Sequence, residues 1–349
     1  MTGAFLEKFP HKPGGHCGSA SMRDLLEFYG HEYSEEMVFG LGSGIDFVYF
    51  GNLAIAPPVC VSGRTRDMEE NACGRLGVKI EFIHGVDAPT GWLDVKRMLD
   101  AGTPVMVLAD VYHLDYLRAK RHFSAHRIVL VGYDEESGVA FVADNDREDI
   151  QECSLENLAK ARSSSYPPQP ADNAYYRMEA PERLQDLEHA IPGAIAEAVR
   201  HNAGSSPCKT SFAYESFRAH RGVAGLKQFA ADMLSWPGSM PDETLETLCK
   251  SIYVSVEKGG TGYGGNFRRM YGRFLKEASL THGGKRIEKI GDEFVAIGDV
   301  WSEMARAFKN HASDGAKAVD AAHPMALEIA EAESRVFEAL DEANCGGRP

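Results

Sequence analysis

Residues 126–146, HRIVLVGYDEESGVAFVADND, are the stretch of sequence that decides the fold. Two apolar runs rich in β-branched residues, HRIVLVGYD and VAFVADN, are joined through the turn DEESG, a pattern typical of a β-hairpin. His126 opens the first run and Asp144 closes the second. Because antiparallel strands place such positions side by side, we expect a histidine and a carboxylate to meet at one end of this hairpin.

The segments before the hairpin alternate between helical and extended patterns. Residues 19–30, SASMRDLLEFYG, predict a helix that ends at Gly30. Residues 40–51, GLGSGIDFVYFG, predict a glycine-rich loop that runs into a strand. A second helix is predicted over residues 91–102, and a strand over residues 103–111. Alternating helices and strands indicate that the first half of the chain is not an all-helical domain.

The composition and the hydrophobic periodicity of the sequence change after the hairpin. Residues 163–173, SSSYPPQPADN, have the composition of a linker and no periodicity. Beyond them, apolar residues recur at helical spacing almost to the end of the chain. We therefore predict the α+β fold class, with an α+β domain over residues 1–165 and an all-helical domain over residues 174–349.

Length and composition restrict the class of protein. The 349 residues are 44% hydrophobic, enough for about two domains with real cores. Acidic residues outnumber basic ones by 51 to 37, which gives a formal net charge of −14. This charge argues against a nucleic-acid partner and is compatible with a cationic substrate. Seven cysteines without C-x-x-C spacing, and the absence of a signal-like or membrane-spanning apolar run, predict a cytoplasmic protein with reduced thiols and no membrane partner.

Cys17 lies in the loop GGHCGS, immediately before a predicted helix. A helix N-terminus presents unpaired N–H groups and the positive end of the helix dipole, and both stabilise a thiolate. The alternative is a buried cysteine that packs as a small hydrophobe. A glycine-rich polar loop is a poor place for that role, so we predict that Cys17 is a nucleophile and that the other six cysteines are structural.

A cysteine nucleophile needs a base and a group that orients the base. His126 and Asp144 are the candidates, because the hairpin brings them together. Taken alone, a histidine beside an apolar strand is more often structural than catalytic. The order cysteine, histidine, aspartate, with the helix first and the hairpin later, is that of papain-like enzymes. We therefore predict Cys17, His126 and Asp144 as a catalytic triad.

The oxyanion hole and the substrate pocket have several candidates. The backbone N–H of Cys17 is expected to be one oxyanion donor. The second is His11, six residues upstream, or His16, although either ring can instead bind substrate or be solvated. Further pocket candidates stand in the segment ADVYHLDYL: Tyr112, Asp115 and Tyr116.

Neither a metal site nor a basic docking surface is strongly indicated. His113 and His122 have aspartates nearby, but no H-E-x-x-H or comparable spacing supports a metal, and none is predicted. One predicted helix carries a basic stripe, which is either a docking patch for an acidic partner or, as we favour, a face paired with the protein's own carboxylates. The stripe is Arg268, Arg269, Arg273 and Lys276. A second basic group, suited to a phosphate or carboxylate near the site, is Arg118, Lys120, Arg121 and His122.

The chain resembles the butirosin-biosynthesis acyltransferase-like family, which combines a papain-like N-terminal domain with a C-terminal helical domain. The matching stretches are HCGSASMRDLLEFYGHEYSEEMVFGLGSG, ADVYHLDYL, HFSAHRIVLVGYD, VADND and GGTGYGGNFRRMYGRFLKEA. The resemblance implies acyl transfer from an acyl carrier protein or other thioester donor to a small-molecule amine, in the biosynthesis of specialised metabolites. It also implies Cys17 as nucleophile, His126 as base and Asp144 as orienting carboxylate, with phosphopantetheine present only as part of the donor and no other cofactor.

Two rival functions remain open at this stage. A cysteine peptidase or amidase of the same fold would use the same triad, with water in place of the amine. A non-catalytic binding protein on a degenerate enzyme fold is the other rival, and the intact triad argues against it. The helical half can also mediate homo-oligomerisation. The glycine-rich residues 40–44 and 258–266 are a cover for the site, a passage for pantetheine, or ordinary turns.

Overall fold

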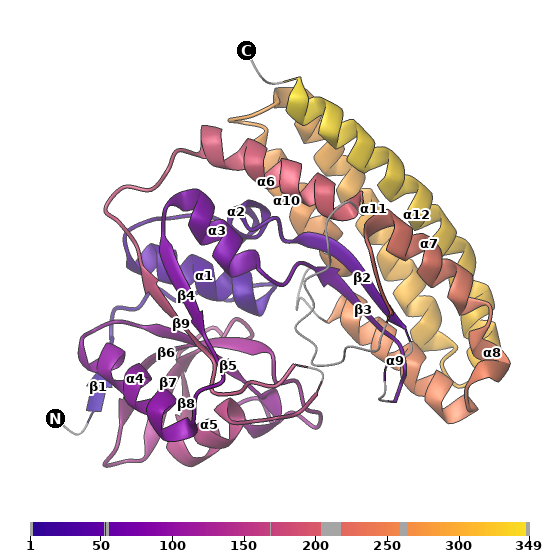
Figure 1. Ribbon diagram of the computed structural model, residues 1–349. Coiled ribbons are helices and arrows are strands. Elements are labelled where there is room, and N and C mark those ends of the chain that lie inside the picture. The colour runs from indigo at the N-terminus through magenta and orange to yellow at the C-terminus, as the bar shows by residue number, and fades with distance from the viewer. Residues whose placement is uncertain are drawn as a thin grey trace. The chain divides into compact units, whose positions relative to one another are not determined.

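A computed structural model describes residues 3–51, 53, 56–167, 169–203, 218–258 and 264–346 (Figure 1). The chain divides into two compact units. The first contains residues 1–38 and 76–184, and the second contains residues 39–75 and 185–349. This division differs from the predicted domains of residues 1–165 and 174–349, because residues 39–75 belong to the second unit.

The first unit is built on a seven-stranded antiparallel sheet in the order β4-β9-β5-β6-β7-β8, with β1 also paired to β6. Its helices are α1 (Cys17–Phe28), α4 (Ala88–Asp100), α5 (Leu155–Arg162) and the 3₁₀ turn η1 (Val111–His113). The helix α2 (Glu35–Leu41) begins in this unit. The strands are β1 (Gly3–Phe5), β4 (Lys79–Ile83), β5 (Val105–Ala109), β6 (His126–Asp134), β7 (Val139–Ala143), β8 (Gln151–Ser154) and β9 (Tyr175–Glu179).

The predicted hairpin is confirmed as β6 and β7, which pair antiparallel. Ile128 and Leu130 of β6 join a buried core with residues of α4 and α5. The alternate residues Val129 and Val131 are buried as well, and α1 packs against β6. Successive side chains of a strand point to opposite faces, so the sheet is covered on both sides here. That double burial explains why the sequence of β6 is a continuous apolar run.

Strand β9 was not predicted from the sequence. It follows the linker-like residues 163–173 and pairs with β4, beside which it lies in Figure 1, and with β5 at Val107. A five-residue strand of mixed polarity after a Ser/Pro-rich segment carries little periodic signal. Its partners, β4 and β5, lie far away in the sequence.

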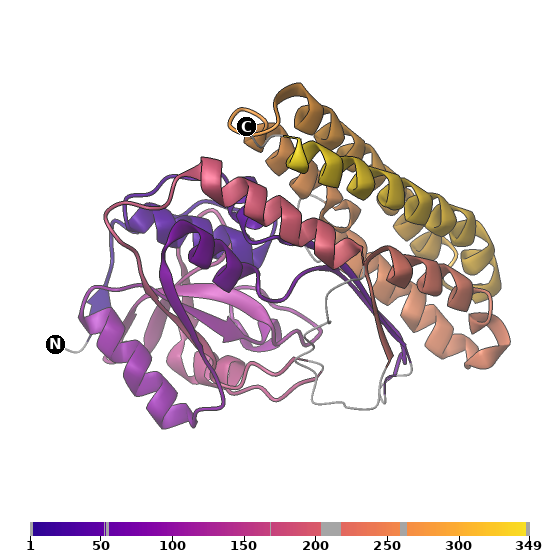
Figure 2. The same cartoon turned by 45° about the horizontal axis from the view of Figure 1, so that its top comes forward.

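The second unit combines helices with a small sheet. The sheet has the order β10-β2-β3, formed by β2 (Ile45–Gly51), β3 (Cys60–Arg64) and β10 (Arg218–Arg221). The helices are α3 (Met68–Leu76, which ends at the unit boundary), α6 (Leu187–Asn202), α7 (Gly222–Met233), α8 (Trp236–Ser239), α9 (Asp242–Glu257), α10 (Arg268–Ala278), α11 (Gly284–Asn310), α12 (Gly315–Cys345) and the turn η2 (Gly265–Phe267). The two longest, α11 and α12, lie side by side (Figure 2).

A helical C-terminal region is thus confirmed, but the all-helical domain is corrected by β9 and β10, which fall within residues 174–349. Strand β10 pairs with β2, and β2 and β3 also pack against α7 and α9, so residues 39–75 belong to the second unit. No helix in the described parts of the chain is both long enough and apolar enough to cross a membrane.

The basic stripe on α10 is largely committed to ion pairs within the second unit. Arg268 is fully buried, and its guanidinium donates to both carboxylate oxygens of Glu333, at 2.7 and 2.8 Å. Trp301 Nε1 donates to the same carboxylate at 2.8 Å. The neighbours form surface pairs, Arg269 with Asp299 and Lys276 with Asp292. These contacts support the favoured interpretation of a self-paired helix face over that of a docking patch.

The glycine-rich residues 40–44 are all buried. A Cβ on Gly40 would lie 2.0 Å from the ring of Phe274, so glycine is required for α2 to approach α10. Of the other glycine-rich segment, residues 259–263 lie outside the described residues.

Candidate active site

Helix α1 begins at Cys17, as the sequence predicts. His16 is its N-cap: the backbone is extended, and the ring Nδ1 accepts from the Ser19 N–H at 3.2 Å. The first helical hydrogen bond runs from Ala20 N to His16 O, at 2.9 Å. The amides of Cys17 and Gly18 belong to the first turn of the helix, and they stand at its positive end beside the thiol.

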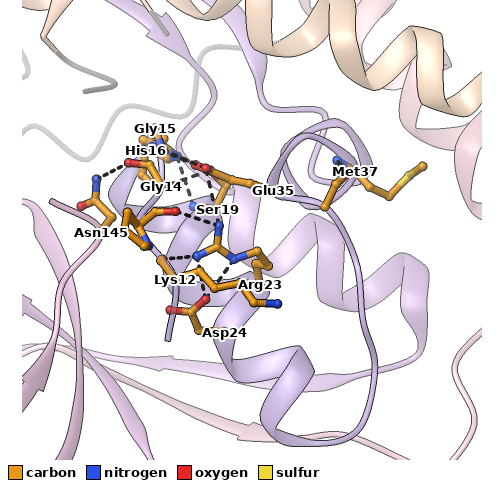
Figure 3. Close-up of polar contacts among 12 residues, drawn as sticks. Lys12, Gly14, Gly15, His16, Ser19, Arg23, Asp24, Glu35, Met37 and Asn145 are labelled. Atoms are coloured by element: carbon orange, nitrogen blue, oxygen red, sulfur yellow. Dashed lines mark hydrogen bonds and ion pairs between the residues drawn. The ribbon is translucent and has the colours of Figure 1, made fainter. Parts of the chain in front are cut away.

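The loop before Cys17 is held by a buried carboxylate that the sequence did not indicate. Glu35 accepts from the backbone N–H groups of Gly15 and His16 and from Ser19 Oγ, each at 2.8 Å. Figure 3 shows its carboxylate pointing at all three. Burial raises the pKa of Glu35, although these hydrogen bonds and the charge of Arg23 act to lower it. Glu35 thus fixes the backbone that delivers Cys17.

Asn145 ties the same loop to the end of β7. Its carbonyl accepts from Gly14 N at 2.9 Å, and its side-chain Nδ2 donates to Gly14 O at 3.0 Å (Figure 3). Asp144 is the preceding residue, so this two-way contact brings the hairpin end against the loop that carries Cys17. This pairing explains how Cys17 comes close to His126 and Asp144, which are more than a hundred positions away in the sequence.

His126 and Asp144 meet as the hairpin predicts. His126 Nε2 lies 2.8 Å from Asp144 Oδ2, and Asp144 is fully buried. Tyr116 donates its O–H to the same oxygen at 2.8 Å, and Asp146 N donates to the other at 3.2 Å. His126 also has a side-chain hydrogen bond and a charge interaction with Cys17, and both act to raise its pKa.

The charges of these groups are strongly coupled. Burial by itself would lower the pKa of His126, but the charge and hydrogen bond of Asp144, helped by Cys17, raise it to about 10. Burial would raise the pKa of Asp144, yet the charge of His126 and the hydrogen bonds from His126 and Tyr116 lower it. Burial and the Asp144 charge raise the pKa of Tyr116, which keeps its proton as a donor. At neutral pH the pair is an imidazolium and a carboxylate.

The two oxyanion candidates have structural roles in this structure. The ring nitrogens of His11 contact Asp24 Oδ2 at 2.8 Å and the carbonyl of Arg147 at 3.0 Å. Asp24 also accepts from Arg23 Nε at 2.9 Å. His16 uses Nδ1 as the cap of α1, and its side chain is buried.

The three pocket candidates are separated. Tyr116 contacts Asp144 and so belongs with the triad. Asp115 accepts from the N–H of Ser154, the N-cap of α5, at 2.8 Å, which makes it a support for that helix. Tyr112 is 47% exposed and stacks on His122, with ring centroids 4.1 Å apart.

A group with metal-ligand chemistry is assembled by the tertiary structure. Asp110, His113 and His122 offer ligand atoms that all lie within 4.8 Å of one another. The Asp110 carboxylate accepts from His122 Nδ1 and Ser164 Oγ, both at 2.7 Å, and from two backbone amides. Burial acts to raise the pKa of Asp110, but these hydrogen bonds lower it to about 2. They satisfy its charge without an ion, and we propose none.

The fold and the site define an α+β protein with a candidate cysteine-nucleophile site confined to its first unit. The chain belongs to the family expected from its sequence. Residues 16–145 match butirosin biosynthesis protein H, N-terminal, and residues 156–340 match a domain of unknown function, DUF4872. The first match includes Cys17, His126 and Asp144. No curated protein matches the chain.

Proposed function

We propose that this protein is a papain-like cysteine acyltransferase that moves an acyl group from a thioester donor to an amine. The donor is an acyl carrier protein or another pantetheine thioester, and the setting is specialised-metabolite biosynthesis. One observation carries the proposal: His126 lies between Asp144 and Cys17, and Cys17 is the first residue of a helix. This is the arrangement that a thiol nucleophile, its base and the orienting group require.

In the first step, the Cys17 thiolate attacks the thioester carbonyl. The new C–S bond forms as the carbonyl oxygen takes up negative charge, and then the C–S bond to the donor breaks. The departing pantetheine sulfur takes the proton from the His126 imidazolium. The products are an acyl-Cys17 thioester, a neutral His126 and a free pantetheine thiol.

In the second step, the amine nitrogen attacks the acyl-Cys17 carbonyl and loses a proton to neutral His126. The C–S bond to Cys17 breaks, which releases the amide and restores the thiolate and the imidazolium. Asp144 stabilises the imidazolium in both resting and product states. Exchange between thioesters is nearly balanced in free energy, whereas amide formation is downhill, so the reaction proceeds if water is kept from the acyl-enzyme.

The oxyanion in both steps is assigned to the amides of Cys17 and Gly18. Both belong to the first turn of α1, at the positive end of the helix dipole and beside the Cys17 thiol. Glu35 and Asn145 hold the loop from which these amides project. The proposal thus uses the backbone in place of the His11 or His16 side chain.

The test is intact-protein mass spectrometry after incubation with a panel of acyl-pantetheine thioesters. We expect the wild type to gain one acyl mass and Cys17→Ala to gain none. Cys60→Ala is the matched control and should be labelled like the wild type, because burial raises the pKa of the Cys60 thiol to about 11. Adding amines to the isolated acyl-enzyme should then release the acyl group as an amide.

The other functions predict different results. Loss of the acyl group in water as fast as with any amine would favour the peptidase or amidase. If no thioester labels the wild type, and Cys17 also reacts slowly with iodoacetamide, Cys17 is not a nucleophile and a binding function is favoured.

A further inference from the structure

An exposed basic loop lies between two residues of the candidate site. Arg118, Lys120 and Arg121 are all exposed, and none forms an ion pair with a residue that the structure describes. They stand in a chain whose formal charge is −14. These three cations within four residues form a locally positive segment in a protein whose net charge is negative.

The loop is anchored at both ends to the site. At one end, Tyr116 donates to Asp144 at 2.8 Å, and its carbonyl accepts from Arg147 at 3.0 Å. At the other end, the loop runs into β6, which begins at His126. Chain length alone keeps the Cα of Arg118 within about 7 Å of that of Tyr116, and the Cα of Arg121 within about 18 Å of that of His126.

The end of the loop before β6 is fastened a second time, and exposed aromatic rings surround it. Phe123 N donates to Asp110 Oδ1 at 3.0 Å, and His122 Nδ1 contacts Asp110 Oδ2 at 2.7 Å. The His122 ring stacks with Tyr112 and with Tyr166, at centroid distances of 4.1 and 4.3 Å. Tyr112, Phe123 and Tyr166 are each nearly half exposed. Exposed apolar groups gathered in one place mark binding surfaces more often than scattered ones do.

We propose that this basic loop, Arg118 to Arg121, binds the phosphate of the acyl donor. The inference rests on the proposed function. Pantetheine thioesters, whether carried on a protein or on coenzyme A, bear a phosphate at the far end of the pantetheine arm. When the thioester carbon reaches Cys17, the tether requires that phosphate to lie near the site.

The charge of the loop also assigns it to the donor and not to the acceptor. An amine acceptor is cationic at neutral pH, so three unpaired cations repel it and an acidic surface elsewhere attracts it. A phosphate has the opposite preference, and arginine offers it paired N–H donors. The loop thereby separates the two substrates of one nucleophile.

The test compares the rate of Cys17 acylation by two donors that differ only in the phosphate. These are acyl-pantetheine and acyl-phosphopantetheine, carrying the acyl chain that best labels the wild type. The variant is Arg118→Glu/Lys120→Glu/Arg121→Glu. Its control makes the same charge change on exposed residues of the second unit: Lys285→Glu/Lys289→Glu/Arg306→Glu.

We expect the loop variant to lower the ratio of kcat/KM for the phosphorylated donor over the unphosphorylated one by roughly tenfold or more. The control should leave that ratio within about twofold of the wild-type value. Parallel measurements with acyl-coenzyme A and with an acyl-loaded acidic carrier protein show which natural source of the phosphate depends most on the loop.

A ratio that stays unchanged in the loop variant, or that falls equally in the control, would overturn the proposal. If neither donor acylates the wild type, the proposed function itself fails, which is a separate result. Should the loop variant not fold, the wild type provides the test alone. Added KCl must then weaken acylation by acyl-phosphopantetheine more than by acyl-pantetheine, and equal salt dependence would reject the phosphate role.

Discussion

Replacing Asp144 with asparagine removes one charge from the site and puts an amide nitrogen in place of the oxygen that accepts from Asp146 N at 3.2 Å. The two side chains have nearly the same shape, and the asparagine carbonyl can still accept from His126 Nε2 and from Tyr116. What disappears is the negative charge 2.8 Å from the imidazole. Burial then acts on His126 with less opposition, and burial favours the neutral ring.

The magnitude follows from the pKa of His126. Its rise from 6.5 to about 10, after burial has acted to lower it, corresponds to a net stabilisation of the imidazolium of roughly 5 kcal/mol, at about 1.36 kcal/mol per pH unit. Asp144 is the largest contributor to that rise. We expect Asp144→Asn to lower the His126 pKa to about 8 or below, which leaves at least half of the rings neutral at pH 8.

Side-chain NMR of the His126 imidazole nitrogens, recorded from pH 5 to 10, measures this directly. Alkylation of Cys17 by iodoacetamide at pH 8 should slow by about twofold or more in the variant, because at least half of the rings are then neutral and no longer stabilise the thiolate. Asp146→Asn is the control, since that carboxylate is half exposed and pairs with Arg147 at the surface. A wild-type His126 that titrates near 6.5, or an identical midpoint in Asp144→Asn, would refute the electrostatic account of the site.

Four further predictions follow from the same contacts. Tyr116→Phe removes one donor from buried Asp144, and it should cost about 1.5–3 kcal/mol in urea unfolding and slow Cys17 acylation less than Asp144→Asn does. Glu35→Gln puts an amide NH2 group against backbone N–H groups whose hydrogen bonds Glu35 accepts, so the acylation rate and the thermal stability should both fall. The control Glu32→Gln, at an exposed position, should change neither. Asp144 has a lowered pKa, so its contribution to stability is present above pH 3.8 and is lost as pH falls through the pKa of the folded state. His126 has a raised pKa, so its contribution to stability is present below pH 6.5 and is lost as pH rises through about 10. The stability difference between wild type and His126→Gln/Asp144→Asn should therefore be largest between about pH 4 and 6.5 in urea titrations, and a difference that grows toward pH 10 would contradict this. Dialysis against EDTA should leave the acylation rate unchanged. If the rate instead falls on dialysis and Zn²⁺ alone restores it, the cluster of Asp110, His113 and His122 binds an ion.

Local sequence signals predicted the parts of the site that depend on one element. The start of α1 at Cys17 follows from a glycine-rich loop before a periodic segment. The hairpin of β6 and β7 follows from two apolar runs around a turn, and its register sets His126 near Asp144. Such features depend on neighbours a few positions away, so their physical cause is visible in a short stretch of sequence.

The contacts that join separate elements left no such signal. Glu35 belongs to a different helix from Cys17, and nothing in its own segment marks it as the partner of Gly15 and His16. Asn145 stands beside Asp144, but its pairing with Gly14 spans 131 positions. Tyr116 and Asp115 were both predicted to line the pocket, because strand-loop spacing does not say which group a side chain reaches; in the structure Tyr116 contacts Asp144 and Asp115 contacts Ser154.

The sequence by itself determined the α+β class, the helical C-terminal region and the order of cysteine, histidine and aspartate, because hydrophobic periodicity and turn chemistry are local properties. Only the tertiary structure decided that residues 39–75 belong to the second unit and that β9 joins the first sheet. It also decided that His11 and His16 support the backbone around Cys17. Strand pairing and buried hydrogen bonds satisfy backbone and side-chain groups from distant segments at once. The choice among possible partners is therefore made by the whole folded chain.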